Sequence, residues 1–315
     1  MHEADAMRYV EVGGLRLSAI GLGTWQFGSL EWGYGATYAA EIAPAIVRRA
    51  IQLGVTLVDT AEIYGFGRSE RIVGQAIAGQ REAVVLATKL VPVLPLPAVV
   101  DWQVRGSLRR LGVEEIDLYQ VHFPNPFVSP RATMAPLRPL LEQGVVRHVG
   151  VSNHALGRWR ASERSLGRPI LTNQVRFSLS APLARWELVP YAREAGRIVI
   201  AYSPLGQGLL SGRHAPGSSA PRDVRRRSPQ FQPRALHLAQ PLLDTLREVA
   251  AAHAATPAQV ALAWLIAQGP VVAIPGARTV AQLEENVAAT ELELSGPELD
   301  RLTAASARFG STVGH

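Results

Sequence analysis

The sequence predicts an α/β protein of the (β/α)8 TIM-barrel class, formed by a single domain over residues 1–315. Eight short apolar runs, rich in β-branched residues, alternate along the chain with eight longer segments of helical spacing. Alternating strands and helices indicate a parallel sheet, and eight repeats favour a closed barrel over an open doubly wound sheet. The chain has 315 residues, 47% of them hydrophobic, which suffices for a large core.

The strands are expected at the short apolar runs. A β-hairpin comes first, over residues 9–17, and turns at Gly13 and Gly14. The eight barrel strands are expected at residues 19–23, 56–59, 84–89, 118–122, 148–152, 172–175, 198–202 and 271–275.

The helices are expected between these strands, and several begin at Ser, Thr or Pro and end near Gly, as helix ends prefer. They span residues 40–53, 69–78, 97–111, 130–143, 155–165, 183–195, 257–268 and 279–290. One further helix is expected at 235–254. Residues 206–234 are rich in Gly, Ser, Pro and Arg and predict a long loop after the seventh strand, and loops of that length are usually functional or disordered.

Composition excludes several classes of protein. Without cysteine the chain has no disulfide framework and no thiolate metal site, and we expect no metal. The first residues, MHEADAMRYVEV, contain acidic side chains and no apolar run, so they do not form a signal peptide. The most apolar stretches, 84–100 and 260–274, are interrupted too often to cross a membrane. We therefore expect a cytoplasmic protein that does not bind membranes.

The charge is basic, with 32 Lys and Arg against 26 Asp and Glu and a formal net charge of +6. Only one of the 32 is lysine, Lys89. A compositional bias toward arginine explains most of the charge. Because the chain has neither interleaved aromatic residues nor a reading motif, we expect no nucleic-acid partner. The single lysine suggests a site where a planar guanidinium would not serve, although chance survival of one lysine is the alternative.

Polar residues stand at the ends of the predicted strands. Asp59, Lys89 and His122 end the second, third and fourth strands, and Tyr64 follows five residues after Asp59. Taken singly, such residues are helix caps, solvated charges or core histidines. Together, at the carboxyl ends of three successive strands, they are typical of a barrel enzyme that brings several groups to one substrate.

The chain resembles the aldo-keto reductase family over nearly its whole length. The motifs that carry the resemblance are GLGTW at 21–25, LVDTAEIYG at 57–65, ATKL at 87–90, LYQVHFP at 118–124, VGVSNH at 149–154, NQV at 173–175, AYSPLGQGLLSGR at 201–213 and IPGARTVAQLEEN at 274–286. The branch with bacterial and plant reductases and potassium-channel β-subunits is the most similar. The resemblance implies carbonyl reduction by hydride from a nicotinamide, with Asp59, Tyr64, Lys89 and His122 as the catalytic tetrad.

The tetrad has a physical logic. Hydride arriving at a carbonyl carbon leaves negative charge on oxygen, so the site must supply a proton. A phenol is a reluctant proton donor at neutral pH unless a cation stabilises its anion, and Lys89 supplies that cation for Tyr64, the general acid. Asp59 keeps the buried lysine charged, and His122 orients the carbonyl.

The cofactor contacts follow from the resemblance alone. It implies that Ser152, Asn153 and Gln174 bind the nicotinamide carboxamide, and that Tyr202 stacks on the ring. The pyrophosphate contacts are Ser203, Leu205 and Gly208, followed by Arg213, and a loop at 206–234 covers the cofactor. Arg222 and Arg225 to Arg227 either assist there or are solvated. Gly23, Thr24, Trp25 and Asp59 also belong to the cofactor set.

NADPH is the expected cofactor, with Arg278 at the adenosine 2′-phosphate and with Glu285 and Asn286 at the adenine. Gln282 and Gly276 stand where many relatives carry an arginine and a lysine, which leaves NADH as an alternative. The expected substrate contacts are Trp25, Tyr64, His122 and Phe123. Trp25, Trp32, Tyr34 and Phe123 either line an apolar mouth or pack around the rim.

The leading hypothesis is a monomeric NADPH-dependent reductase of small aldehydes and ketones. The alternative hypothesis is an NADPH-binding, redox-sensing regulatory subunit with slow turnover, which an intact tetrad does not exclude.

Overall fold

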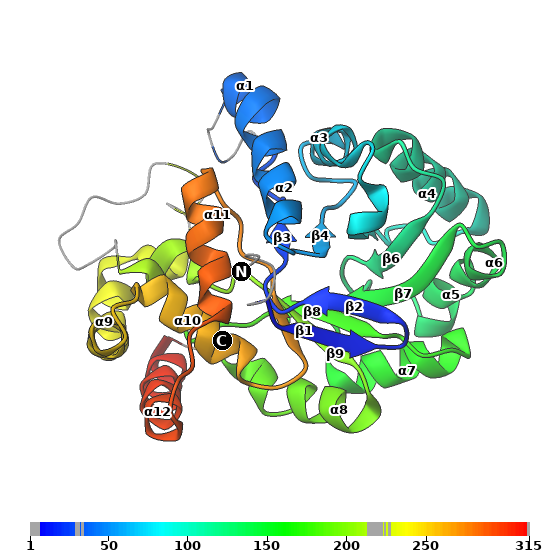
Figure 1. The fold of residues 1–315 in the computed structure, drawn as a ribbon. Coiled ribbons are helices and arrows are strands. Elements are labelled where there is room, and N and C mark those ends of the chain that lie inside the picture. Colours follow the sequence, from blue (N-terminus) through cyan, green and yellow to red (C-terminus); the bar gives the residue numbers. More distant parts are fainter. Residues whose placement is uncertain are drawn as a thin grey trace.

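Eight parallel strands form the centre of the molecule in a computed structural model that describes residues 7–28, 32, 35–212, 223, 225 and 228–313 (Figure 1). They follow the chain in the order β3 (Leu22–Gly23), β4 (Leu57–Asp59), β5 (Val85–Leu90), β6 (Ile116–Val121), β7 (Val146–Ser152), β8 (Thr172–Arg176), β9 (Ile198–Tyr202) and β10 (Val271–Ala273). The first and last strands meet, since Ile20 pairs in parallel with Ala273 and Gly21 N–H donates to the Ala273 carbonyl at 2.8 Å. The predicted TIM barrel is thus confirmed.

The closing seam of the barrel is narrow. A Cβ atom at Gly23 would lie 2.7 Å from the carbonyl oxygen of Ile274, so only glycine allows the two backbones to approach this closely. The regular strand is short here. Of the expected strand at 19–23, only Leu22–Gly23 is regular, and Ile20 forms an isolated bridge.

The predicted N-terminal hairpin is also confirmed. Strands β1 (Tyr9–Val12) and β2 (Leu15–Ser18) pair antiparallel and lie across the end of the barrel (Figure 1). Leu15 and Leu17 are buried in one apolar cluster with barrel residues such as Leu118 and Ile200. The hairpin therefore closes the barrel at the end opposite the polar strand ends.

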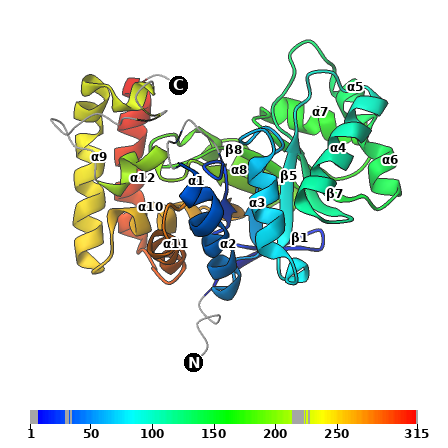
Figure 2. The ribbon, with the colours of Figure 1, turned by 90° about the horizontal axis from the view of Figure 1, so that it is seen from above.

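Helices surround the sheet (Figure 2). They are α1 (Gly35–Thr37), α2 (Ala43–Gln52), α3 (Arg68–Ile77), α4 (Pro97–Leu111), α5 (Pro130–Met134), α6 (Leu137–Glu142), α7 (Leu156–Leu166), α8 (Leu188–Ala195), α9 (Pro233–Ala252), α10 (Pro257–Ile266), α11 (Val280–Val287) and α12 (Gly296–Val313). Short 3-10 segments lie at Arg81–Ala83, Leu183–Arg185, Gly206–Ser211, Pro229–Phe231 and Ala288–Thr290, and a π-helical turn at Tyr38–Ile42 joins α1 to α2.

Two predicted helices are interrupted, and proline explains both breaks. The segment 130–143 divides into α5 and α6 at Ala135–Pro136, because Pro136 has no N–H to donate to the carbonyl of Ala132 and Pro139 has none for Ala135. The segment 183–195 becomes a 3-10 turn followed by α8, because Pro190 likewise leaves the carbonyl of Trp186 without its helical donor. A single helix over either range was the wrong prediction.

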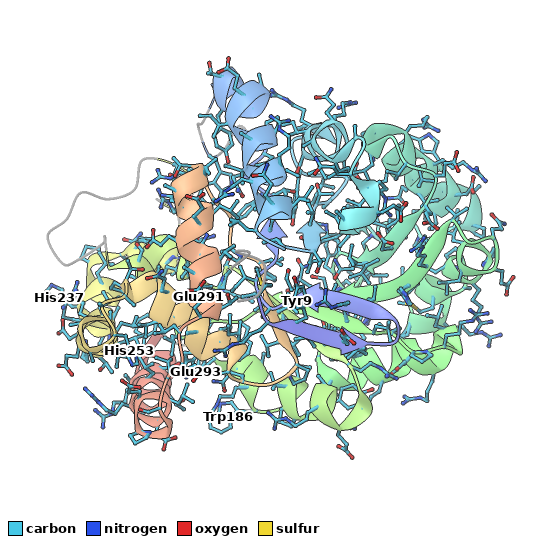
Figure 3. The ribbon with its side chains drawn as sticks, viewed as in Figure 1. Tyr9, Trp186, His237, His253, Glu291 and Glu293 are labelled. Atoms are coloured by element: carbon cyan, nitrogen blue, oxygen red, sulfur yellow. The ribbon has the colours of Figure 1, made fainter. Side chains whose placement is uncertain are left out.

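The C-terminal part contains a helix that the sequence reading missed, α12. It packs beside α9, and His253 bonds Glu298 across the two elements at 2.8 Å (Figures 2 and 3). Ser295 donates both its backbone N–H and its hydroxyl to Glu298 Oε2, each at 2.7 Å, which fixes the helix start and lowers the pKa of Glu298 to about 2. Within the described residues no single helix is long and apolar enough to cross a membrane; α9 and α10 pass that test only as a pair bent by 94°.

The predicted loop at 206–234 is shorter at both ends than expected. It begins with the 3-10 segment Gly206–Ser211, and α9 already starts at Pro233. Residues 213–222, which include Arg213 and Arg222, lie outside the described residues, as do Arg226 and Arg227.

Candidate active site

Three neighbouring strands bring an acid, a lysine and a histidine to one edge of the barrel. Asp59 ends β4, Lys89 lies near the end of β5, and His122 directly follows β6. The register supports this placement, because Asp59 lies opposite Ala87 and Lys89 lies opposite Gln120 on the next strand. The carboxyl edge predicted from the strand order therefore gathers these side chains.

Lys89 is the centre of the group. Its Nζ contacts Asp59 Oδ1 at 2.5 Å, the Thr60 carbonyl at 2.8 Å and the Tyr64 hydroxyl at 3.3 Å. Burial alone would lower the pKa of Lys89, but the charge of Asp59 and the hydrogen bonds outweigh it and hold the pKa above its ordinary 10.5. Lys89 is therefore an ammonium at neutral pH, directed at the phenol.

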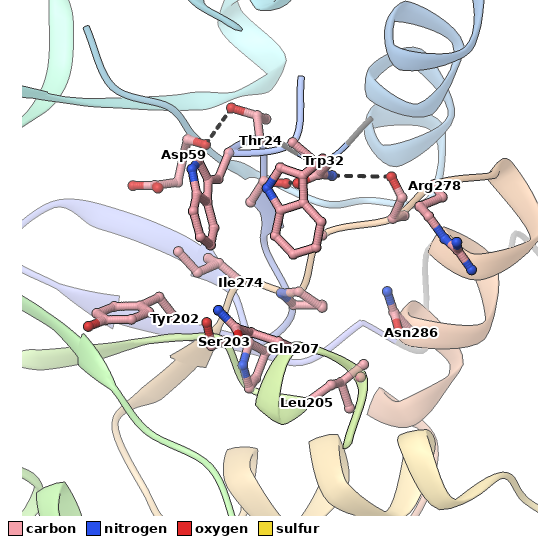
Figure 4. A pocket seen from close by; sticks show the side chains of 18 of the residues that line it. Thr24, Trp32, Asp59, Tyr202, Ser203, Leu205, Gln207, Ile274, Arg278 and Asn286 are labelled. Carbon is pink, nitrogen blue, oxygen red and sulfur yellow. Dashed lines mark hydrogen bonds between the residues drawn. The ribbon is translucent and has the colours of Figure 1, made fainter. Parts of the chain in front are cut away.

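The Asp59 carboxylate is saturated with donors. Oδ1 accepts from Lys89, and Oδ2 accepts from Gln174 Nε2 at 2.7 Å and from Gln120 Nε2 at 3.1 Å. Thr24 Oγ1 donates to the Asp59 backbone carbonyl at 2.8 Å and fixes the end of the strand (Figure 4). The sequence reading did not include Gln120, although it stands two residues before His122 and hence on the same face of the strand.

Tyr64 and His122 lie edge to face, with ring centroids 5.8 Å apart, and both line the cavity. Burial raises the pKa of Tyr64 above 10, and the Lys89 cation offsets part of that rise. Burial, together with the nearby Lys89 cation, lowers the pKa of His122 to about 3. At neutral pH the two groups are thus a phenol and an uncharged imidazole, both able to donate a hydrogen bond.

The loop that carries Tyr64 is fastened by Glu62, another residue that the sequence reading missed. Glu62 Oε1 accepts from Val91 N–H at 2.6 Å and from Gln103 Nε2 at 2.9 Å. Burial raises the pKa of Glu62, although the Val91 bond opposes the rise. The contacts join the loops after β4 and β5, and so hold the phenol near the ammonium.

A cavity of about 650 Å³ opens beside these groups. Figure 4 shows it extending from Thr24 and Asp59 toward Arg278 and Asn286. Of the predicted site residues, it is lined by Gly23, Thr24, Trp25, Asp59, Tyr64, His122, Ser152, Asn153, Gln174, Tyr202, Ser203, Leu205, Gly208, Gly276, Arg278, Gln282, Glu285 and Asn286.

Other predicted residues lie elsewhere. Lys89 is fully buried beneath the cavity, and Phe123 is 36% exposed beside His122 without lining it. Arg213 and Tyr34 fall outside the described residues. The lining also includes residues that were not predicted, among them Gln26, Ile63, Gln207, Ala258 and Ile274.

Polar side chains surround the end of the cavity near Asp59. Asn153 accepts a hydrogen bond from the Tyr202 hydroxyl at 3.0 Å, and its backbone has a φ of +58°. Ser152 Oγ donates to the Gln174 carbonyl at 2.8 Å. These bonds fix the rim, and a left-handed Asn at a cavity wall is the kind of backbone strain that clusters at binding sites.

The far end of the cavity is formed by the loop after β9 and the start of α11. Ser203 and Gln207 have φ values of +49° and +54°, and Gly208 has +99°. Thr279 caps α11 by accepting from Gln282 N–H at 3.1 Å, and Gln282 Oε1 accepts from the backbone N–H of Arg278 at 2.9 Å. The exposed Arg278 side chain stands at a helix N-terminus, where the helix dipole favours anions.

Arg225 closes one wall. It pairs with Asp223 at 2.6 Å, donates to the Gln207 carbonyl at 3.3 Å, and lies 5.8 Å from the ring centroid of Trp32. Trp32 meets Trp25 edge to face at 5.1 Å. Arg225 is thus one of the residues that line the cavity.

Comparisons with known proteins agree on one family. The model of the Aldo/keto reductase family matches residues 19–307. An uncharacterized oxidoreductase of Mycobacterium bovis is 53% identical over 304 residues, 96% of this chain and 94% of that protein. The methylglyoxal reductase YeaE of Escherichia coli is 34% identical over 93% of this chain and 92% of that protein. The crystal structure of an aldo-keto reductase from Klebsiella pneumoniae in complex with NADPH has a TM-score of 0.77 and 31% identity over 95% of this chain and 94% of that one.

Proposed function

This chain belongs to the aldo/keto reductase family of oxidoreductases, and we propose that it reduces aldehydes and ketones with NADPH, using Tyr64 as the proton donor. The observation that carries the proposal is the placement of the Tyr64 hydroxyl, which lies 3.3 Å from the Lys89 ammonium at the wall of the cavity. A family relationship alone would leave the reaction open, whereas this geometry matches the needs of carbonyl reduction.

The dinucleotide fits the cavity. Its volume of about 650 Å³ lies within the range of cofactor sites, and it is long enough to reach from the tetrad to the N-terminus of α11. Ser152, Asn153 and Gln174 would hold the nicotinamide carboxamide, and Tyr202 would stack on the ring. Glycine at 208 would let the backbone approach the pyrophosphate, and Arg278 would bind the adenosine 2′-phosphate. The relative from Klebsiella was solved with NADPH, which supports this choice of cofactor.

When bound, the reduced nicotinamide supplies the hydride. The residues of this chain manage the charge that the hydride creates on the carbonyl oxygen. Tyr64 donates its phenolic proton to that oxygen, Lys89 stabilises the phenolate that remains, and neutral His122 donates a hydrogen bond to the same oxygen. Asp59 keeps Lys89 charged through the 2.5 Å contact. Each group thus acts in the protonation state that its surroundings impose.

Exposed apolar side chains on the loops that follow three strands of the site support a preference for apolar carbonyl compounds. Of the large apolar side chains that are exposed in the described part of the chain, seven lie on the loops after β4, β5 and β6; we call them the apolar rim, namely Ile63, Phe66, Val93, Leu94, Leu96, Phe123 and Phe127. Ile63 also lines the cavity. Asn125 Nδ2 donates to the Pro92 carbonyl at 2.9 Å and thereby ties two of these loops together.

The test is to mix the purified protein with NADPH and 4-nitrobenzaldehyde and to follow the absorbance of the reduced nicotinamide. Wild type should turn over, and Tyr64→Phe should lose about 10²- to 10⁴-fold in kcat while its Kd for NADPH stays the same. Failure to reduce any member of a broad carbonyl panel, with NADPH bound, would exclude the reductase. Tight NADPH binding with very slow turnover would favour the alternative, a redox-sensing regulatory subunit.

A further inference from the structure

Gln120 is a fully buried amide in the barrel interior, and the tetrad does not include it. It lies on β6, two residues before His122, and its side chain is 0% exposed. Its Nε2 donates to Asp59 Oδ2 at 3.1 Å. Gln120 does not line the cavity, so it acts on bound molecules only through another residue.

Burying the Gln120 amide costs free energy, so we look for the interaction that offsets this cost. Its Oε1 has no hydrogen-bond partner among the described residues. A buried acceptor without a partner loses its hydrogen bonds to water and gains none in return, and a methionine of similar shape would avoid that cost. Across the sheet, Gly150 lies opposite both Gln120 and Thr172, and the hydroxyl of Thr172 is also unpartnered within the described part. The bond to Asp59 is therefore the gain that this amide brings.

The contacts of Asp59 indicate what that gain is. Its two oxygens are divided, with Oδ1 on the Lys89 ammonium and Oδ2 on the amides of Gln120 and Gln174. A carboxylate that turned about its Cβ–Cγ bond would take Oδ1 away from Lys89, and two donors on Oδ2 prevent that turn. Gln174 lines the cavity, where the proposed function assigns its amide to the nicotinamide carboxamide as well. Gln120 is the anchor that does not depend on the cofactor.

We propose that Gln120 is a positioning residue, which holds the Asp59 carboxylate against Lys89 and so keeps Lys89 charged and directed at Tyr64. This inference rests on the proposed function for its catalytic consequence. The ionisable groups that face Lys89 are Asp59 from β4, Tyr64 from the following loop and His122 from the loop after β6. Of these, Asp59 is the one that holds the ammonium charge in place, and Gln120 acts on it directly.

The first test uses the fact that Lys89 is the single lysine of the chain. Protein labelled with ¹³C at the lysine ε-carbon gives one NMR signal, and its shift against pH reports the charge of Lys89 without any cofactor or substrate. In Gln120→Met the signal should titrate at least half a pH unit below wild type, because the less well-held carboxylate stabilises the ammonium less. Thr172→Val, buried in the same layer, is the control and should titrate as wild type.

The second test is kinetic. Gln120→Met should lose about tenfold to hundredfold in kcat, the range expected for a hydrogen bond to a charged group, and the alkaline limb of kcat should move to lower pH. The KM and the Kd for NADPH should stay within about twofold. Gln120→Glu should retain more activity than Gln120→Met near pH 6, because a buried carboxyl group at position 120 stays protonated beside Asp59 and donates a hydrogen bond to the Asp59 carboxylate. Its kcat should then fall as the pH rises.

The outcomes separate the two ideas. Unchanged Lys89 titration in both Gln120 variants, with kcat near wild type, would overturn the positioning role even if the reductase proposal holds. A lowered Lys89 titration in a protein that reduces no carbonyl would support the positioning role and overturn the reductase proposal. If Gln120→Met does not fold, the pH dependence of Gln120→Glu decides, and a profile equal to that of wild type would contradict the inference.

Discussion

Lys89 and Asp59 form an ion pair inside the barrel, with Nζ and Oδ1 2.5 Å apart and side chains that are 0% and 2% exposed. Removing two charges from water is costly, and a buried pair is retained only where contact is close and the remaining polar atoms are bonded. Both conditions are met, since Lys89 also contacts Thr60 and Tyr64 and Asp59 also binds two amides. The pair therefore keeps one cation fixed behind the phenol.

Lys89→Arg should abolish most of the reductase rate. The pocket of Lys89 has three partners within 3.3 Å of a single atom, and a guanidinium is too wide to replace that atom without displacing Tyr64. We expect kcat to fall by about a hundredfold or more while the Kd for NADPH, measured by fluorescence quenching, changes little. Arg301→Lys, at an exposed surface position, is the matched control. Near-normal turnover of Lys89→Arg would show that any cation serves there.

The rate should be nearly independent of pH across the neutral range. Above about pH 3 His122 is neutral, because burial lowers its pKa, and Tyr64 stays protonated to beyond pH 10, because burial raises its pKa. We expect kcat for aldehyde reduction to vary by less than about threefold between pH 5 and pH 9. An acid limb near pH 6.5 that disappears in His122→Asn would contradict the neutral imidazole.

The stability of the protein should fall in acid for a related reason. Burial lowers the pKa of His154 to about 4, as it lowers that of His122 to about 3, both from 6.5. The unfolded chain thus binds more protons than the folded chain below pH 6.5. The free energy of unfolding is therefore full above pH 6.5 and falls as the pH drops toward 4, by up to about 2.7 kcal/mol per pH unit for two protons.

Urea unfolding at several pH values measures that slope. His154→Gln, which keeps a donor for the Ser152 carbonyl, should remove about half of it, and His237→Gln, at an exposed position on α9, should leave it unchanged. A slope that is the same in wild type and His154→Gln would mean that this imidazole is not held neutral.

The sequence alone was sufficient to predict the positions of those site residues whose place depends on the strand topology. Asp59, Lys89 and His122 end successive strands, and the carboxyl ends of parallel strands meet at one edge whatever the details of packing. Gln120 was missed because a mid-strand amide resembles an ordinary interior residue until its partner is known. Arg225 could not be assigned, because the chain has 31 arginines and only the tertiary structure shows that Arg225, like Arg278, lines the cavity.

Other misses had signals in the sequence. Ser295 and Glu298 have the spacing of a capping box and indicate the start of α12, although a (β/α)8 pattern requires no further helix at this point. Pro136 and Pro190 likewise indicate the breaks that interrupt two predicted helices.

Arg278→Ala should weaken NADPH binding more than NADH binding. The Arg278 side chain is exposed at the N-terminus of α11, where the guanidinium and the helix dipole both favour a phosphate. We expect the Kd for NADPH to rise by about tenfold and the Kd for NADH to change by less than twofold, both by fluorescence titration. Arg105→Ala, an exposed position on α4 that does not line the cavity, is the control. Equal effects on the two cofactors would remove Arg278 from the 2′-phosphate.

The apolar rim predicts a preference for longer aldehydes. Phe66 is one example. It is 95% exposed and has a φ of +54°, a backbone conformation that is unfavourable for an aromatic residue and that no internal packing offsets. Such strain is typical of binding sites, which is the reason to expect a contact with substrate. Burying a methylene contributes about 0.8 kcal/mol, so kcat/KM should rise by up to about fourfold per methylene along a series from propanal to decanal. Phe127→Ser should flatten that rise, whereas Trp186→Ser, an exposed aromatic away from these loops, should not. A kcat/KM independent of chain length would mean that the rim contributes nothing to substrate binding.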